Sequence, residues 1–224
     1  MRKAKKNFDT EDYLSAYAYQ TDVKAKIDSE MAVGGLWDKM GEHQFKFLLQ
    51  NGLKPESSLL DIGCGSLRGG VRFINYLDEE KYTGFDISKG VIQAGMEKLD
   101  ELGLGNKKPT IFVNEGKNLR FEDLDGECFD YLLAQSVFSH LHAAHIEECF
   151  ENLNKVMHAD SRFFFTFHPG PEFLQRSDTD FEYSPSFFIE LAEKMGYSIE
   201  DLSDEYAHPR KQGMMLVRLN LNPS

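Results

Sequence analysis

The 224-residue sequence has little of what marks several common classes of protein. Its three cysteines (Cys64, Cys128 and Cys149) lie far apart and form no CxxC pair, which argues against a disulfide framework and a structural zinc site. No apolar run approaches the roughly 18 residues of a membrane helix, so we expect no membrane insertion. The N-terminal segment has a basic tip with no apolar stretch after it, so we expect no secretory signal and a cytoplasmic location.

Basic residues are also scarce relative to acidic ones. The sequence has 25 Lys and Arg against 37 Asp and Glu, which gives a formal net charge of -12. A protein that grips a phosphate backbone usually presents a basic face, because its affinity comes from neutralising phosphates. We therefore expect no nucleic-acid partner.

What is present is an ordinary globular composition, with 41% hydrophobic residues in a chain long enough for one sizeable core. Apolar residues recur at helical spacing over 9–30 and over 38–51. We expect residues 1–57 to form a helical cap or lid that packs on a core domain of residues 58–224, the whole being one globular unit.

From residue 58 onward, short apolar runs alternate with helical segments. The strand-like runs cover 58–63, 81–87, 110–115, 129–135 and 162–168, and the helical segments between them cover 66–77, 88–102 and 143–157. Alternation of this kind predicts an α/β fold, a doubly wound parallel sheet with helices on both faces. After a helix near 185–195, two further strand-like runs, 197–206 and 213–221, are separated by a short connection, so we expect an antiparallel pair at the end of the sheet.

The stretch "DIGCGSLRGG" (61–70) follows the first strand and precedes a helix. Gly63 and Gly65 permit backbone torsions and a close approach that side chains would prevent, and the helix start offers unsatisfied N–H groups. A plain tight turn would also use glycines. The context favours a site for a nucleotide-like ligand.

Charge and spacing distinguish between two such ligands. The pyrophosphate motif G-x-G-x-x-G requires a glycine where Arg68 stands, and Asp61 would face the phosphates unfavourably. S-adenosylmethionine carries an ammonium and a sulfonium instead, and an acid beside the loop suits both. Asp86, 23 residues after Gly63, ends the second strand, where an acid can accept both ribose hydroxyls. Its alternative role as a helix N-cap is less attractive, because Ser88 is available for it.

These motifs resemble those of the class I S-adenosylmethionine-dependent methyltransferases, in the small-molecule branch. "LLDIGCGSLRGG" (59–70) is similar to their first motif, "YTGFDIS" (82–88) to their ribose-binding acid, and "CFDYLLAQSVFSHL" (128–141) to their fourth-strand motif. The resemblance implies a Rossmann-like, seven-stranded sheet, mostly parallel with an antiparallel last strand.

The resemblance also implies which residues bind the cofactor. The first motif would hold the methionine part of the cofactor with Asp61, Gly63, Cys64 and Gly65. The ribose and adenine would be bound by Asp86 and Ile87 after the second strand, and the adenine also by Glu115 and Gly116 after the third. The end of the fourth strand would line the site with Gln135, Ser136 and Val137.

Methyl transfer from a sulfonium is an in-line displacement, so a protein mainly positions the acceptor and removes at most one proton. His140 follows the fourth strand and His168 ends the fifth, both at the edge of the sheet where ligands bind. We consider both as candidate catalytic bases, with a plain hydrogen-bonding role in a turn as the alternative. Neighbouring His142 and His145 lack a carboxylate or cysteine that would complete a metal site, so we expect no metal.

The sequence therefore predicts a methyltransferase that uses S-adenosyl-L-methionine and acts on a small molecule or a biosynthetic intermediate. One alternative is an NAD(P)-dependent oxidoreductase, which Asp61 and the glycine spacing oppose. A second is a non-catalytic module that binds S-adenosylmethionine without turning it over.

Overall fold

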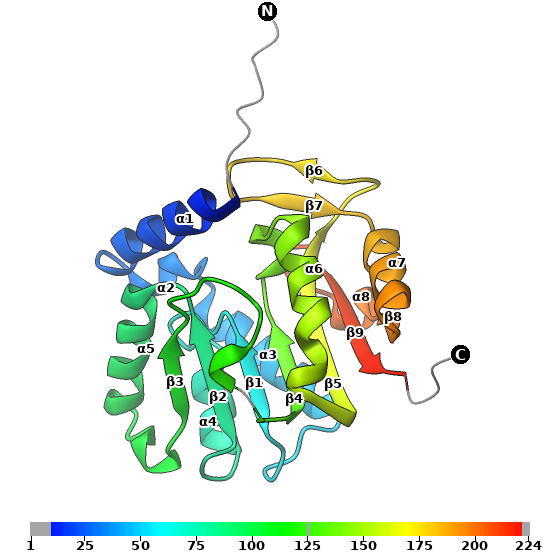
Figure 1. Cartoon of the computed structure of the whole chain (residues 1–224). Helices are drawn as coiled ribbons and strands as arrows, with labels where there is room; N and C mark the ends of the chain where they lie inside the picture. The colour runs from blue at the N-terminus through cyan, green and yellow to red at the C-terminus, as the bar shows by residue number, and fades with distance from the viewer. Residues whose placement is uncertain (1–9, 125, 221–224) are drawn as a thin grey trace, which may run out of the picture.

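The structure, a computed structural model, describes residues 10–124 and 126–220. Five parallel strands form the centre of the sheet in the order β3-β2-β1-β4-β5 (Figure 1). Their bounds are β1 (Leu59–Ile62), β2 (Tyr82–Asp86), β3 (Thr110–Val113), β4 (Phe129–Ala134) and β5 (Met157–Pro169). Placing β1 between β2 and β4 reverses the direction of winding, and open α/β sheets bind ligands at such a reversal.

The sheet continues beyond β5 with β9 (Gly213–Leu219) and then β8 (Tyr197–Asp201). Strand β9 is antiparallel to both neighbours, with Phe163 opposite Val217 and Phe167 opposite Gly213 in β5. These seven strands confirm the predicted Rossmann-like α/β fold with an antiparallel last strand.

Two short strands that the sequence did not predict follow β5. β6 (Leu174–Gln175) and β7 (Phe181–Tyr183) form an antiparallel pair, and β7 runs parallel to the end of β5. Segments of two and three residues are too short to show a hydrophobic period, so the prediction of seven strands missed them. They extend the sheet to nine strands.

Helices cover both faces of the sheet (Figure 1). Neighbouring residues of β5 point to opposite faces: Phe163 and Phe165 belong to one apolar core, and Phe164 belongs to the other. The helices that follow the strands are α4 (Gly70–Tyr76), α5 (Lys89–Glu101), α6 (Ala143–Asn152), α7 (Pro185–Met195) and α8 (Ser203–Tyr206), with single 3-10 turns at Leu104–Lys107, Glu122–Leu124, Phe138–His140 and Leu153–Lys155.

Local signals explain where some of these helices begin and end. The side chain of Ser88 accepts the N–H of Val91 and caps α5, and Ser184 caps α7 in the same way. Gly196 ends α7 in the left-handed conformation that glycine adopts without cost. One predicted strand was too long. Of the run 197–206, only Tyr197–Asp201 forms a strand, β8. The carboxylate of Asp201 accepts the N–H of Ser203, where α8 begins.

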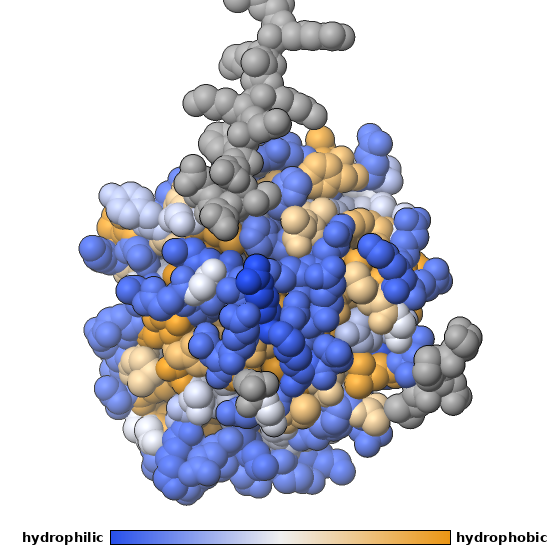
Figure 2. All heavy atoms as spheres, in the orientation of Figure 1, coloured by the Kyte–Doolittle hydropathy of each residue, from blue (hydrophilic) through white to orange (hydrophobic). Residues whose placement is uncertain are grey.

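Three N-terminal helices precede the sheet: α1 (Thr10–Ala25), α2 (Ser29–Ala32) and α3 (Trp37–Gln50). Helices α1 and α2 lie at the end of the molecule toward which the parallel strands point (Figure 1). Hydrophilic residues cover much of the face in Figure 2, with apolar residues in smaller patches between them. Over the described ranges, no helix is both long enough and apolar enough to cross a membrane.

Candidate active site

A cavity of about 450 Å³ lies at the carboxyl ends of the central strands. Its walls come from the loops that follow β1, β2 and β4, from helix α1, and from the connection between α8 and β9. Open α/β sheets bind ligands at this edge, and the cavity is within the size range of small-molecule sites.

The glycine loop after β1 forms the floor of the cavity. Gly63 and Gly65 have φ angles of +69° and +56°, in the left-handed region that favours glycine. A Cβ atom on Gly63 would lie 2.5 Å from Cγ2 of Val137, and one on Gly65 would lie 2.7 Å from Cγ1 of Val33. Both positions therefore need glycine for conformation and for space.

Asp61 lies at the base of this loop and is only 4% exposed. Its carboxylate accepts a hydrogen bond of 2.7 Å from the hydroxyl of Tyr82. Burial, with a smaller contribution from the charge of Asp86, raises the pKa of Asp61 to about 7, against the lowering effect of the Tyr82 hydrogen bond. A buried carboxyl that is costly to ionise is well suited to bind a cationic group of a ligand.

Asp86, at the end of β2, is the second carboxylate of the cavity. It accepts the N–H of Gly65 at 3.1 Å and that of Ser88 at 2.9 Å. Burial raises its pKa to about 6, although these main-chain donors act in the opposite direction. Ile87, which follows Asp86 in the sequence, also lines the cavity, and Ser88 is the N-cap of α5.

The end of β4 contributes Gln135, Ser136 and Val137 to the cavity. Ser136 has a φ of +59°, uncommon for a residue with a side chain, and its N–H donates to Oγ1 of Thr166 at 2.7 Å. The buried amide of Gln135 accepts from the hydroxyl of Tyr206 at 2.5 Å. Polar groups of β4, β5 and α8 thus hold this wall in one arrangement.

The residues predicted after β3 are placed differently. Glu115 and Gly116 do not line the main cavity; they line a smaller neighbouring one of about 190 Å³. Glu115 is exposed and pairs with Lys89 at 2.8 Å. Asn114, which directly follows β3 and is buried, does line the main cavity. Cys64 lines it as well, as predicted for the first motif. An adenine contact by Glu115 and Gly116 remains a prediction.

Both candidate bases line the main cavity. Nδ1 of His140 lies 2.8 Å from the carbonyl oxygen of Thr179 and 3.1 Å from Oδ1 of Asp180. The hydrogen bond with His140 lowers the pKa of Asp180 to about 2. Burial lowers the pKa of His168, and the charges of His140 and Arg176 lower it further. His140 lies in a 3-10 turn, as its alternative, hydrogen-bonding role would require, and it also lines the cavity.

Helix α1 closes the side of the cavity and is anchored toward both of its ends. Oδ1 of Asp22 accepts from Oγ of Ser88 at 2.5 Å and from the N–H of Gly90 at 2.8 Å, at the start of α5. The hydroxyl of Tyr13 accepts the N–H of His142 at 3.0 Å, at the start of α6.

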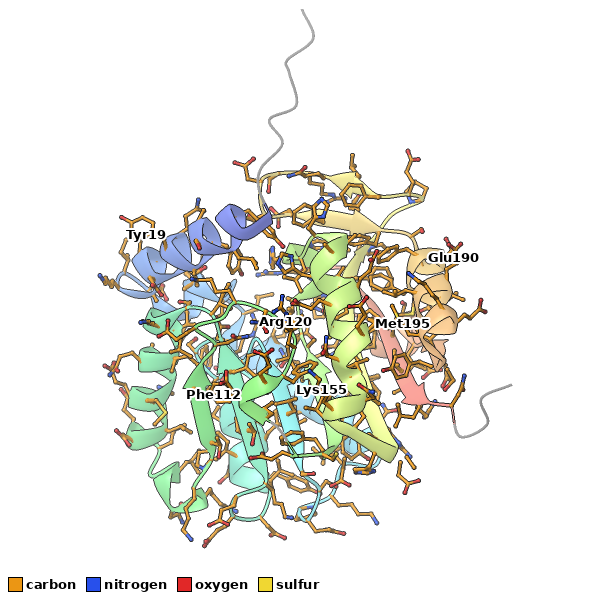
Figure 3. All side chains as sticks on the ribbon, in the orientation of Figure 1. Tyr19, Phe112, Arg120, Lys155, Glu190 and Met195 are labelled. Atoms are coloured by element: carbon orange, nitrogen blue, oxygen red, sulfur yellow. The ribbon has the colours of Figure 1, made fainter. Side chains whose placement is uncertain are left out.

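Between these anchors, the ring of Tyr17 lies 5.3 Å from that of His140, measured between centroids. Tyr19, two residues along, is exposed on the outer side of α1 (Figure 3). The sequence predicts a helical cap in this region but not which residues of α1 contact the core, because contacts between residues more than 60 positions apart leave no local pattern.

Sequence reasoning also missed Arg68, His208, Arg210 and Gln212 as lining residues. Arg68 was visible only as a break in the dinucleotide motif, and the other three lie in a connection that carries no recognisable motif. Within residues 10–124 and 126–220, no group of three or more His, Cys, Asp or Glu side chains is arranged to hold a metal ion.

Residues 60–163 match the family described as "Methyltransferase domain". This segment resembles a methyltransferase domain. The match spans the glycine loop, Asp61, Asp86 and strand β4, and it confirms the family resemblance expected from the sequence.

Several solved structures share the fold of this chain over a longer range than residues 60–163. Magnesium protoporphyrin IX methyltransferase (ChlM) from Synechocystis PCC 6803, solved with bound SAM, is 14% identical with a TM-score of 0.69, covering 97% of this chain and 100% of that one. An S-adenosylmethionine-dependent methyltransferase from Clostridium acetobutylicum ATCC 824 is 11% identical with a TM-score of 0.65, covering 89% and 98%. The [4+2]-cyclase SpnF is 13% identical with a TM-score of 0.60, covering 80% and 82%. At these identities the likeness establishes the fold, on which different reactions occur.

Proposed function

We propose that the protein transfers a methyl group from S-adenosyl-L-methionine to a small-molecule acceptor. The observation that carries this proposal is the placement of Asp61 and Asp86 on either side of a glycine loop, in one cavity of a methyltransferase domain. The similar ChlM structure, which was solved with bound SAM, supports the choice of cofactor.

The residues of the cavity fit the groups of this cofactor. Asp61 would pair with the ammonium of the methionine part, and the buried setting makes such a pair stronger than it would be in water. Asp86 would accept the ribose hydroxyls, a contact that both of its oxygens can make beside their main-chain donors. Gly63 and Gly65 would allow the ligand to approach the backbone. When bound, the cofactor supplies an activated methyl group.

His140 is the side chain best placed to remove a proton from an acceptor. Because a carbonyl oxygen only accepts, the contact with Thr179 requires that Nδ1 of His140 carries the ring proton. The neutral ring then has its lone pair on Nε2. Asp180 would stabilise the charged ring that forms when Nε2 takes up the proton. His168, at the end of β5, is the second candidate.

Two other functions were open from the sequence. An NAD(P)-dependent oxidoreductase would have to place a pyrophosphate beside buried Asp61, which is electrostatically unfavourable. A binding module without turnover would keep the cofactor contacts and lack a working base. The interaction between His140 and Asp180 argues against that module, because it prepares a base where the acceptor would bind.

Two measurements test the proposal. Isothermal titration of the protein with S-adenosylhomocysteine and, separately, with NADPH should show binding of the first alone. A cell extract incubated with the protein and isotopically labelled S-adenosylmethionine should then yield a labelled small molecule in mass spectrometry. Binding of NADPH in preference to S-adenosylhomocysteine would refute the choice of cofactor, and cofactor binding without any labelled product would favour the binding module.

We also infer a cytoplasmic location, which suits the three cysteines, all of them free thiols.

A further inference from the structure

Two arginines from distant parts of the chain converge on one point of the cavity wall. Arg68 follows the glycine loop, and Arg210 lies in the connection between α8 and β9. A Cβ atom on Gly34 would lie 2.9 Å from Nη1 of Arg210 and 4.0 Å from Nη1 of Arg68. Both arginines line the cavity. Two positive charges therefore share one corner of it.

The partners of these arginines are main-chain carbonyl groups. Nη1 of Arg68 donates to the carbonyl oxygens of Val33 at 2.7 Å and Gly35 at 3.1 Å, and Nη2 of Arg210 donates to that of Gly34. Neither arginine forms an ion pair with a carboxylate in the described part of the chain. Three consecutive carbonyls provide partial negative charge but no full charge.

The charge of Arg68 is the more costly of the two to bury, because the residue is only 8% exposed. Its Nε is buried and has no hydrogen-bond partner. A buried charge normally needs a charged partner or a full set of hydrogen bonds, and a buried donor without a partner is costly. This corner is thus electrostatically incomplete.

The pKa values of the basic groups at this corner reflect the positive charges around them. Burial lowers the pKa of Arg68, and repulsion from Arg210 lowers it further. Burial, together with the charges of His43 and the two arginines, lowers the pKa of His208 to about 4. Asp61 acts on Arg68 in the attractive sense, but its own charge is suppressed by burial. A positive corner in a chain of net charge -12 calls for an anionic ligand group.

We propose that Arg68 and Arg210 form a carboxylate-binding subsite within the cavity. The planar guanidinium fork matches the two oxygens of a carboxylate, and such charge-assisted pairs are stronger than neutral hydrogen bonds. This inference rests on the proposed function, which offers two sources of the carboxylate. One is the methionine part of the cofactor, and the other is an acidic acceptor.

The test uses the full-length protein and the variant Arg210→Gln, because Arg210 is exposed and its replacement leaves the buried contacts of Arg68 in place. Arg218→Gln serves as the matched control: this arginine pairs with Glu200 at 3.2 Å and is not part of the cavity wall. The probes are S-adenosylhomocysteine, which has the carboxylate, and 5′-deoxy-5′-methylthioadenosine, which lacks the amino-acid part. A second variant, Arg68→Lys, keeps the charge and removes the fork.

If the carboxylate is that of the cofactor, Arg210→Gln should weaken S-adenosylhomocysteine at least tenfold and change methylthioadenosine by less than twofold. If it belongs to the acceptor, the affinity for both probes should be unchanged, and labelling of acidic compounds in the extract should fall at least tenfold. Arg68→Lys should act in the same direction in either case. Unchanged affinity together with unchanged labelling in Arg210→Gln would overturn the subsite.

This result is distinct from failure of the proposed function. Failure of that function would show as no binding of S-adenosylhomocysteine, or no labelled product, by the unaltered protein.

Discussion

Replacement of Asp61 by Asn should make the free energy of unfolding fall less as pH rises, and it should weaken cofactor binding. Burial raises the pKa of Asp61 from 3.8 to about 7, so the folded protein holds a proton there over a pH range in which the unfolded chain has lost it. Because the folded state binds more protons, its stability falls as pH rises from the unfolded pKa toward the folded one. The variant Asp61→Asn has no such proton to lose.

The size of the effect follows from these two pKa values. Each unit of separation corresponds to about 1.4 kcal/mol, and at pH 5 only part of the separation has been crossed. Between pH 5 and pH 8, the free energy of unfolding of Asp61→Asn relative to the unaltered protein should therefore rise by about 2 to 3 kcal/mol. The fixed cost of fitting an amide beside the hydroxyl of Tyr82 is the same at both pH values and cancels in the difference.

Urea unfolding at pH 5 and pH 8 measures this quantity directly. Asp100→Asn is the control, since Asp100 is an exposed carboxylate on α5 outside the cavity, and its difference should stay within about 0.5 kcal/mol. Titration with S-adenosylhomocysteine should show at least a tenfold loss of affinity in Asp61→Asn only. A difference near zero for Asp61→Asn would show that its carboxyl is not perturbed by burial, and the argument would fail.

Three further predictions concern the cavity. Asp86→Ala should weaken S-adenosylhomocysteine at least tenfold in isothermal titration with the fold intact in circular dichroism, because charge-assisted bonds worth about 1.5–3 kcal/mol each are lost; unchanged affinity would remove Asp86 from the site. Gly63→Val should abolish that binding, since its side chain would meet Val137, whereas Gly105→Ala, which has open space around it, should bind normally; retained binding in Gly63→Val would make the loop a plain turn. His140→Ala should lower the single-turnover rate by about 10²–10⁴-fold and Asp180→Asn by less, both with unchanged cofactor affinity, and a loss under threefold in His140→Ala would exclude it as the base.

The parallel part of the fold could be predicted because each central strand is a short apolar run next to a helix. The apolar runs beginning at 58, 81, 110 and 129 became β1 to β4 within two residues at each end. The first motif and the acid after β2 were equally readable, because glycine torsion and a carboxylate at a strand end are local properties. Asp61 and Asp86 therefore reached one cavity as expected.

The remainder of the site depends on contacts that no local pattern records. Asp180 reaches His140 only because the short strands β6 and β7 fold back along the end of β5. Arg210 reaches Gly34 across 176 positions of sequence. Glu115 and Gly116, which the resemblance places near the adenine, line the smaller neighbouring cavity, and the preceding residue Asn114 lines the main one.

The position of β9 has a consequence for how the chain assembles. Residues 163–167 of β5, "FFFTF", are five uncharged, buried residues with high β propensity, and β9 covers their outer edge. Until segment 213–219 docks, this edge offers free N–H and C=O groups beside exposed phenylalanines, and such an edge readily pairs with another chain. The segment that protects this edge against aggregation thus lies about 50 residues further along the sequence. A side chain on Gly213 would contact Phe167 too closely and loosen β9. Such a change would reduce the soluble yield before it altered the cavity.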